Sequence, residues 1–343
     1  MGDYKFSEMF NNKLYKTPYH SAELSGLSFL ITGGAGFIGS NLVEYLLKFG
    51  AGHVRVLDNL SNGYFENIKE FLSLPNFEFI EGDIRDLETC KKSLENIDFV
   101  LHQAALGSVP RSIEDPIKTN SVNIDGFLNV LEAVRSVSRE IRIVYAASSS
   151  SYGDSDALPK VEGIEGRPLS PYAVTKLVNE LYAEVFSKVY GLHTIGLRYF
   201  NVFGPKQNPN NPYAAVIPIF CKSFLVGERP TIFGDGKTSR DFTFIENVVQ
   251  ANIIALFAKD IEKHEIFNVA CGDQISLNDT ITLLKKVSGK DIQVNYKPNR
   301  KGDIMHSKAS IEKIKKMLGY KPLYNFETGL QIVYNWYKEQ AIL

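Results

Sequence analysis

The chain has 343 residues, with 38 lysines and arginines against 39 aspartates and glutamates, so its net charge is close to zero. This length predicts a large core and two domains. No basic run is long enough to indicate binding to nucleic acid or to a membrane surface. The three cysteines lie far apart without metal-ligand spacing, so we expect reduced thiols, no metal site and a cytoplasmic protein. No apolar run approaches the ~18 residues of a membrane span.

The first 26 residues contain Tyr, Asn, Lys and His but no apolar core of the kind found in signal peptides. We therefore expect residues 1–26 to form an N-terminal extension that packs on the following domain. A targeting peptide is not expected.

From residue 27 onward, short apolar runs alternate with segments of helical period. This alternation predicts an α/β fold with a Rossmann-type, doubly wound parallel sheet. The expected strands are 27–32, 53–58, 76–80, 98–102, 141–148, 193–199 and 266–270, and the expected helices are 36–49, 115–136 and 171–190.

The strand and helix rhythm loosens after Gly204 into stretches rich in proline and glycine, which indicates a smaller C-terminal substrate domain. Because the strand at 266–270 would return to the first sheet, we expect the two domains to interleave. The NAD-binding domain is predicted at 27–203 plus about 240–273, and the substrate domain at 204–239 plus 274–343.

Three glycines, Gly33, Gly36 and Gly39, lie where the first strand passes into the first helix. Glycine tolerates the turn that this junction needs and lets a pyrophosphate approach the backbone. The helix N-terminus offers free N–H groups to the phosphates. Asp58 ends the next strand, where a carboxylate can bind both ribose hydroxyls and would repel a 2′-phosphate. The pattern therefore predicts NAD as the cofactor.

Tyr172 and Lys176 are four residues apart and share one face of the predicted helix 171–190. A phenol is a poor base at neutral pH because its pKa is about 10. A neighbouring ammonium and a positive nicotinamide ring would both lower that pKa. Ser148 ends the fifth strand and can hydrogen-bond the same substrate oxygen, although three further serines follow it. These three residues are the predicted catalytic group.

Motifs that cover nearly all of 27–340 are similar to those of a known family. They are TGGAGFIG at 32–39, DNLS at 58–61, GDIRD at 82–86, LHQAA at 101–105, SPYAVTK at 170–176, RYFNVFG at 198–204, SRDF at 239–242 and RKGD at 300–303. On these motifs the chain resembles the extended short-chain dehydrogenases/reductases. Within them it resembles the UDP-sugar 4-epimerases, especially bacterial enzymes that act on UDP-N-acetylglucosamine.

The resemblance implies a catalytic cycle. The Tyr172 phenolate takes the proton of the sugar 4-hydroxyl while C4 gives hydride to NAD, the 4-keto sugar turns over, and hydride returns to its other face. It also implies a homodimer formed through the helices that begin at Asp115 and Pro171. The UDP-N-acetylgalactosamine produced would serve a surface polysaccharide.

The resemblance, together with the glycine motif, gives a full set of expected contacts. Asn123 matches a position that orders the cofactor site, and Arg240 and Arg300 match positions that grip the diphosphate. The expected NAD contacts are Gly33, Gly36, Phe37, Ile38, Gly39, Asp58, Asn59, Ser61, Asp83, Ile84, Gln103, Ala104, Ala105, Asn123, Tyr172, Lys176 and Tyr199. The expected UDP-sugar contacts are Ser108, Ser148, Ser149, Asn201, Val216, Phe233, Arg240, Arg300, Asp303 and Ser307.

Ser307 bears on the choice of sugar, because glucose-only bacterial relatives resemble a tyrosine at this position. A small side chain leaves room for a 2-acetamido group, which favours UDP-N-acetylglucosamine.

Epimerases of UDP-glucose and UDP-galactose, or of UDP-N-acetylglucosaminuronate, stay open as alternatives. A 4,6-dehydratase would need an acidic pair where Ser149 and Ser150 stand. A decarboxylase, a keto-sugar reductase and a non-enzymatic nicotinamide-sensing scaffold are the remaining alternatives.

Overall fold

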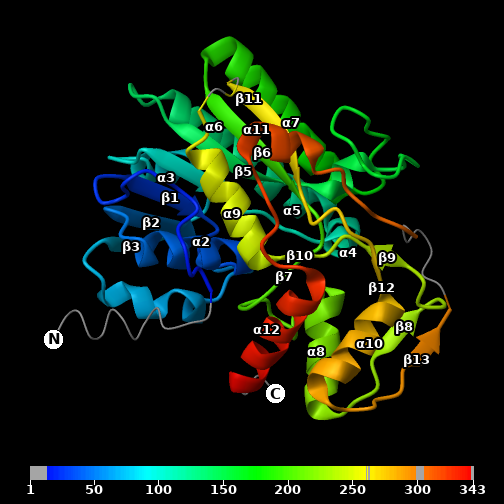
Figure 1. Cartoon of the computed structure of the whole chain (residues 1–343). Coiled ribbons are helices and arrows are strands. Elements are labelled where there is room, and N and C mark those ends of the chain that lie inside the picture. The colour runs from blue at the N-terminus through cyan, green and yellow to red at the C-terminus, as the bar shows by residue number, and fades with distance from the viewer. Residues whose placement is uncertain (1–13, 260, 262, 299–304, 341–343) are drawn as a thin grey trace.

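A computed structural model describes residues 14–259, 261, 263–298 and 305–340. Its centre is a sheet of seven parallel strands in the order β11-β6-β5-β4-β1-β2-β3 (Figure 1). The fold class predicted from the sequence is thus confirmed, and each expected strand is present with its ends shifted by at most two residues. The strands are β1 (Ser28–Thr32), β2 (His53–Asp58), β3 (Phe77–Glu81), β4 (Phe99–His102), β5 (Arg142–Ser148), β6 (His193–Tyr199) and β11 (His264–Val269).

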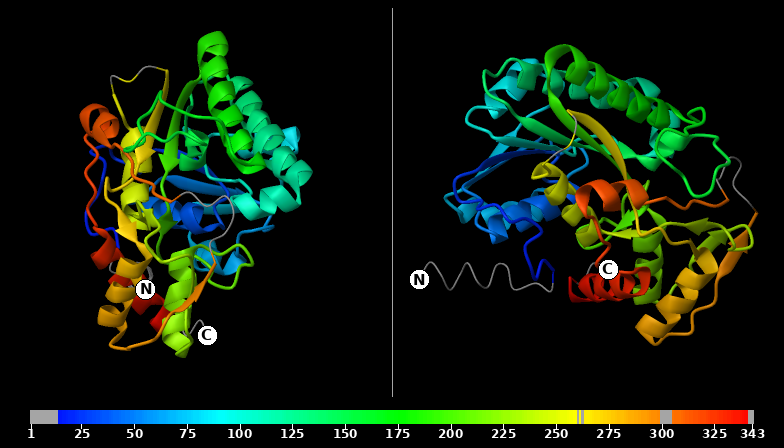
Figure 2. Two further views of the ribbon diagram at one scale, coloured as in Figure 1. Left: turned by 90° about the vertical axis from the view of Figure 1, so that its right-hand side faces the viewer. Right: turned by 45° about the horizontal axis from the view of Figure 1, so that its top comes forward.

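Helices cover both faces of the sheet (Figures 1 and 2). On one face α2 (Phe37–Lys48) and α9 (Ile245–Leu256) pack with the strands into the larger apolar core. On the other face α3 (Leu87–Ser93), α6 (Gly126–Arg135) and α7 (Pro171–Tyr190) enclose a second core. The sequence predicted α7 with the observed ends, because its apolar positions repeat at helical spacing between Ser170, which caps it, and Gly191 in the left-handed conformation.

The single helix expected at 115–136 is wrong in detail. The structure has α5 (Pro116–Asn120), a π-helical turn at Ser121–Asp125 and then α6, with α4 (Val109–Glu114) immediately before them. The π turn contains Asn123, whose side chain is bonded to neighbouring elements rather than to solvent. Such turns accommodate one extra residue within a helix and are common at functional sites.

A smaller unit lies beyond the C-terminal edge of the sheet (Figure 2). Its short strands pair as β10 with β7, β12 with β9, and β13 with β8. We retain the division into two interleaved domains as a proposal, since β11 joins the large sheet after this unit has begun. The elements are β7 (Val202–Phe203), α8 (Val216–Val226), β8 (Thr231–Phe233), β9 (Ser239–Arg240), β10 (Thr243–Phe244), β12 (Ile275–Ser276), α10 (Leu277–Ser288), β13 (Asn295–Lys297), α11 (Glu312–Leu318) and α12 (Phe326–Glu339). Short 3₁₀ turns occupy Phe65–Asn67, Lys69–Ser73 and Ser149–Tyr152.

The described part of the N-terminal extension packs against α2 and α9. Tyr15 is fully buried, its hydroxyl donates to Asn41 Oδ1 over 2.7 Å and its backbone N–H donates to Glu246 Oε1 over 3.0 Å. Lys48 Nζ donates to the carbonyl of Leu14 over 2.8 Å. Residues 1–13 lie outside the described residues. Across the described part of the chain, none of the helices has the length and apolar character needed to cross a bilayer.

Candidate active site

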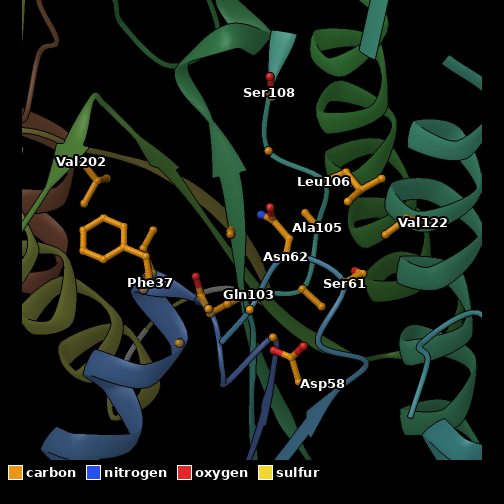
Figure 3. Close-up of a pocket in the computed structure, with 18 of the residues that line it drawn as sticks. Phe37, Asp58, Ser61, Asn62, Gln103, Ala105, Leu106, Ser108, Val122 and Val202 are labelled. Atoms are coloured by element: carbon orange, nitrogen blue, oxygen red, sulfur yellow. The ribbon is translucent and has the colours of Figure 1, made fainter. Parts of the chain in front are cut away.

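A cleft of about 540 Å³ opens at the C-terminal edge of the sheet, beside β1 and β4. The chain leaves β1 and β4 toward opposite edges of the sheet, which opens a crevice between the connections that follow them. Doubly wound parallel sheets commonly bind ligands in this crevice. Figure 3 shows Asp58 at the end of β2, and Gln103 and Ser108 in the connection between β4 and α4. All but one of the predicted NAD contacts line it, namely Gly33, Gly36, Phe37, Ile38, Gly39, Asp58, Asn59, Ser61, Asp83, Ile84, Gln103, Ala104, Ala105, Tyr172, Lys176 and Tyr199.

The glycine turn leaves no space for side chains. Gly33 has a φ of +71°, and a Cβ there would lie 2.6 Å from the backbone nitrogen of Ala104. A Cβ on Gly39 would lie 2.2 Å from the carbonyl oxygen of Gly33. The helix α2 begins after Gly36, and no side chain caps its first N–H groups. This bare, positively polarised turn fits the pyrophosphate of a dinucleotide.

The carboxylate of Asp58 shapes the same turn. It accepts hydrogen bonds from the N–H of Ala35 over 3.0 Å and from the N–H of Leu60 over 2.8 Å. Burial raises the pKa of Asp58, and these two N–H groups oppose the shift. Each carboxylate oxygen can accept a further bond, so Asp58 can both hold the turn and bind the ribose hydroxyls.

The loops beside Asp58 are held by two polar networks. Asn59 Nδ2 and Arg85 Nη2 donate to Asp83 Oδ2 over 2.8 Å and 2.7 Å, and the bond from Arg85 is the main reason why the pKa of Asp83 falls to about 2. On the far side, the Tyr199 hydroxyl donates to Gln103 Oε1 over 3.2 Å. Both networks therefore hold cleft-lining side chains in place through bonds within the protein.

Asn123 is the predicted NAD contact that does not line the cleft. It is buried, its Oδ1 accepts from the N–H of Leu106 over 2.8 Å, and its Nδ2 donates to Thr175 Oγ1 over 3.0 Å. Leu106 lies in the loop after β4, next to the predicted NAD contacts Ala104 and Ala105, and Thr175 belongs to α7. Asn123 therefore orders the site by joining this loop to α7.

The predicted catalytic side chains meet at the end of β5. Ser148 ends that strand, and its hydroxyl interacts with the phenol of Tyr172. The Ser148 hydroxyl also accepts from the N–H of Ser150 over 3.1 Å and from its hydroxyl over 2.9 Å. Lys176, one turn after Tyr172, donates from Nζ to the carbonyl of Ala146 over 2.7 Å. A substrate oxygen near Ser148 would thus lie within reach of the phenol.

The side chains around Tyr172 do not lower its pKa as the sequence led us to expect. Burial raises the pKa of the phenol, and the hydrogen bond with Ser148 offsets only part of that shift. The pKa of the phenol shows no lowering by Lys176, whose ammonium donates to the carbonyl of Ala146. Burial lowers the pKa of Lys176 to about 8, while the carboxylate of Glu180 acts in the opposite direction.

The predicted UDP-sugar contacts divide into three groups. Ser108, Ser148, Ser149 and Asn201 line the cleft. Arg300 and Asp303 lie outside the described residues. The remaining four belong to the smaller unit and do not line the cleft in this structure, so their roles stay predictions. They are Val216, Phe233, Arg240 and Ser307.

Arg240 and Ser307 are nevertheless neighbours. The N–H of Ser307 donates to the carbonyl of Ser239 over 3.1 Å, and Arg240 Nη1 donates to the same carbonyl over 2.9 Å. The strand β9 and the segment that follows residue 304 therefore bring a cation and a small side chain together, although 67 positions separate them in sequence.

The sequence analysis missed the residues that close the open side of the cleft. They come from the loop after β2, from the start of α4, from the π-helical turn, and from the segment between β7 and α8. The proline- and asparagine-rich stretch at 205–212 marked a loop but carried no motif that placed it over the cleft. The missed side chains include Asn62, Tyr64, Val109, Val122, Lys206, Gln207, Asn208, Asn211 and Tyr213.

Comparison with known proteins agrees with this geometry. The sequence pattern of the NAD dependent epimerase/dehydratase family matches residues 29–270. The chain belongs to this family. The resemblance to NAD-dependent extended short-chain dehydrogenases/reductases is thereby confirmed, as is NAD as the cofactor of the family.

Full-length relatives are similar over almost their whole length. A putative UDP-glucose 4-epimerase of Methanocaldococcus jannaschii is 37% identical over 90% of this chain and 98% of its own. The structure of a UDP-N-acetylglucosamine 4-epimerase of Methanobrevibacter ruminantium, in complex with UDP-N-acetylmuramic acid, is 38% identical with a TM-score of 0.86, covering 92% of this chain and 99% of its own. A UDP-glucuronic acid 4-epimerase of Bacillus cereus, bound to UDP-glucuronic acid and NAD, is 33% identical with a TM-score of 0.85, covering 92% and 100%.

Replacing Asp58 by asparagine should weaken the preference for NAD over NADP. The change removes the charge that binds the ribose hydroxyls and repels a 2′-phosphate. A hydrogen bond to a charged group contributes about 1.5–3 kcal/mol, which corresponds to roughly 10- to 150-fold in affinity. Calorimetry on protein stripped of cofactor would compare both dinucleotides. Asp235→Asn, in an exposed loop of the smaller unit, is the control. An Asp58→Asn protein with an unchanged preference would contradict the assigned role.

Proposed function

We propose that this protein catalyses the reversible 4-epimerisation of UDP-N-acetylglucosamine to UDP-N-acetylgalactosamine with NAD retained between turnovers. The observation that carries the reaction type is the meeting of Ser148, Tyr172 and Lys176 in the cleft that the glycine turn and Asp58 also line. The names of the similar full-length proteins, which are 4-epimerases of UDP-sugars, support the same reaction.

The glycine turn and Asp58 would hold NAD, which would supply the acceptor for hydride from C4 of the sugar and its donor on the return. The side chains then have two tasks. Ser148 offers its hydroxyl to the sugar 4-oxygen and keeps that oxygen beside Tyr172. The phenol oxygen of Tyr172 receives the proton of the 4-hydroxyl as the carbonyl forms, and gives it back to the oxygen when C4 is reduced from the other face. The reaction is redox-neutral, because each proton and hydride removed is restored.

Lys176 places a positive charge beside this exchange. Its pKa of about 8 leaves the ammonium as the main form at neutral pH. The bond to Ala146 fixes that charge against β5, one helical turn from the phenol. This cation does not lower the pKa of Tyr172 in the structure, where burial acts against ionisation, and we propose that it stabilises the phenolate that forms during proton transfer.

The choice of UDP-N-acetylglucosamine rests on the small side chain of Ser307 beside Arg240. A similar structure named as an epimerase of this sugar adds support. UDP-glucose and uronic-acid sugars are the alternatives, since epimerases with these names are also similar. We extend the proposal to a cytoplasmic enzyme that supplies a surface polysaccharide, which a fluorescent fusion and sugar analysis of a deletion strain would test.

Purified protein without added cofactor should interconvert UDP-N-acetylglucosamine and UDP-N-acetylgalactosamine, as followed by proton NMR. Tyr172→Phe should lower turnover by roughly 10²–10⁴-fold, because a general acid/base has been removed. Tyr190→Phe changes an exposed phenol at the other end of α7 and serves as the matched control.

Parallel samples with UDP-glucose and UDP-N-acetylglucosaminuronate identify the preferred sugar. A requirement for added NADH would indicate a reductase and reject the epimerase. Turnover by Tyr172→Phe within a factor of two of wild type would reject the role given to the phenol.

Ser307→Tyr should reduce turnover of UDP-N-acetylglucosamine while turnover of UDP-glucose, where present, persists or rises. The acetamido group sweeps extra volume as the keto sugar turns, and overpacking typically costs about 1–3 kcal/mol, or roughly 5- to 150-fold in rate. Met305→Tyr, at an exposed side chain of the same segment, is the control. Equal losses on both sugars would indicate general damage, and no loss would show that residue 307 does not limit the sugar pocket.

The outer surface of α4, α5 and α7 supports the expected homodimer. Ile117 is 82% exposed and Leu181 is 53% exposed, and Ile113, Val174 and Val185 are exposed nearby on the same helices. Because α4 and α5 both pack against α7, these exposed side chains lie on neighbouring helices. Contiguous apolar surfaces of this kind commonly bind another protein. We propose that a second copy of the chain covers this surface.

Leu181→Asp should convert the dimer into a monomer in sedimentation equilibrium, because two buried carboxylates would face the apolar partner surface. Leu323→Asp places the same charge on an exposed leucine before α12 and should leave the mass unchanged. A monomeric wild-type protein, or a Leu181→Asp protein with unchanged mass, would contradict the proposal.

A further inference from the structure

The segment 207–215 connects β7 to α8 and closes one side of the cleft. Its residues Gln207, Asn208, Asn211 and Tyr213 all line the cleft. The segment is shaped by its own turns, since Asn211 Oδ1 accepts from the N–H of Tyr213 over 2.9 Å and the Asn211 carbonyl accepts from the N–H of Ala214 over 2.8 Å. It therefore presents Asn211 and Tyr213 as a preformed pair.

This pair contacts the NAD-binding side through Arg111 of α4. The Arg111 guanidinium lies 4.7 Å from the centre of the Tyr213 ring, and its Nη2 donates to Asn62 Oδ1 over 3.1 Å. Asn211 Nδ2 donates to the same Asn62 oxygen over 3.2 Å. The Tyr213 hydroxyl donates to the carboxylate of Glu114, also on α4. We call these five residues, Asn62, Arg111, Glu114, Asn211 and Tyr213, the clasp.

The clasp joins three pieces of the chain across the mouth of the cleft: the loop after β2, helix α4, and the segment 207–215. Asn62, Asn211 and Tyr213 line the cleft, and Figure 3 shows Asn62 among the lining side chains. Arg111 does not line it, and instead contacts both Asn62 and Tyr213. Its influence on a ligand would therefore be exerted through those two residues.

Contacts of this kind, made by partly exposed groups, are individually weak. A set of weak contacts between two sides of a mouth suits a closure that must also reopen. The apparent affinity of a ligand that binds the closed form falls in proportion to the fraction of closed protein. The clasp is therefore placed to set that fraction.

We propose that Arg111 is a positioning residue that holds the segment 207–215 closed over a bound nucleotide diphosphate sugar. The identity of this ligand rests on the proposed function. The reaction needs such closure, because the keto sugar must turn over within the site before it is reduced. If the keto sugar escaped, the protein would be left with NADH in place of NAD and could not oxidise the next substrate molecule.

Arg111→Ala tests the proposal, with Arg135→Ala as a matched control. Arg135 also lies 4.7 Å from the centre of a tyrosine ring, that of Tyr190, but at the opposite edge of the sheet. The Kd for UDP, measured by calorimetry on the NAD-loaded protein, should rise roughly 2- to 10-fold in Arg111→Ala. Amide hydrogen exchange over 207–215 should become faster. The KM for UDP-N-acetylglucosamine should rise by the same factor as the Kd.

Tyr213→Phe provides a second variant that keeps the ring beneath Arg111 and removes the hydroxyl, with its bond to Glu114 and its interaction with Arg111. It should shift the Kd and the exchange rate in the same direction by less. Arg135→Ala should match wild type in all three measurements. Unchanged UDP affinity and unchanged exchange over 207–215 in Arg111→Ala would overturn the proposal, as would equal effects of both arginine variants.

The outcome separates this proposal from the function on which it rests. UDP binding that depends on Arg111, without turnover of any UDP-sugar, would reject the epimerase and support the clasp. Turnover with UDP affinity that is independent of Arg111 would reject the clasp alone. A wild-type protein that binds neither UDP nor UDP-sugars would overturn both.

Discussion

The side-chain amide of Asn123 joins the loop after β4 to helix α7, and the geometry of the cleft depends on this link. The side chain accepts from the N–H of Leu106 and donates to Thr175, and the backbone carbonyl of Asn123 accepts from Asn179 Nδ2 over 2.7 Å. Tyr172 and Lys176 lie on the same helix as Thr175. The amide of Asn123 therefore fixes the position of these catalytic side chains relative to the loop after β4, which lines the predicted NAD site. The π turn around Asn123 directs the side chain to both partners. A buried, fully bonded amide is a rigid link because each lost bond would leave a desolvated group.

Two opposing demands meet at Tyr172. Burial excludes water from the phenol and raises its pKa, yet the proposed reaction uses the phenolate. Among the side chains, the hydroxyl of Ser148 offsets part of this rise in pKa. Lys176 is itself made less basic by burial, and Glu180 opposes that effect. The positive nicotinamide ring of bound NAD would favour the phenolate, which would make proton transfer depend on the cofactor.

The sequence was sufficient to predict the strands of the sheet and the glycine turn with Asp58, because each of these features depends on residues that are close together in the chain. Gly33, Gly36 and Gly39 fall at a strand-helix junction, and Asp58 ends the next strand, so spacing alone places them together. The π turn at Asn123 was not predictable, since it depends on bonds to Leu106 and Thr175, which lie far away in the chain. Arg111 and Tyr213 likewise gave no signal. Their contact depends on how the smaller unit sits against α4, and periodicity contains no information about that.

The two walls of the cleft are built from contacts of different strength, and this difference matches what each must do. Around the dinucleotide, the turn at Gly33 and the buried networks of Asp58 and Gln103 leave little freedom to move. At the mouth, Asn62 and Glu114 are exposed and their bonds are readily exchanged for water. A redox-neutral cycle returns NAD to its starting state, so its site can stay closed, whereas each nucleotide sugar must enter and leave. Rigidity at the sheet and reversible contacts at the mouth are therefore the arrangement that this chemistry requires.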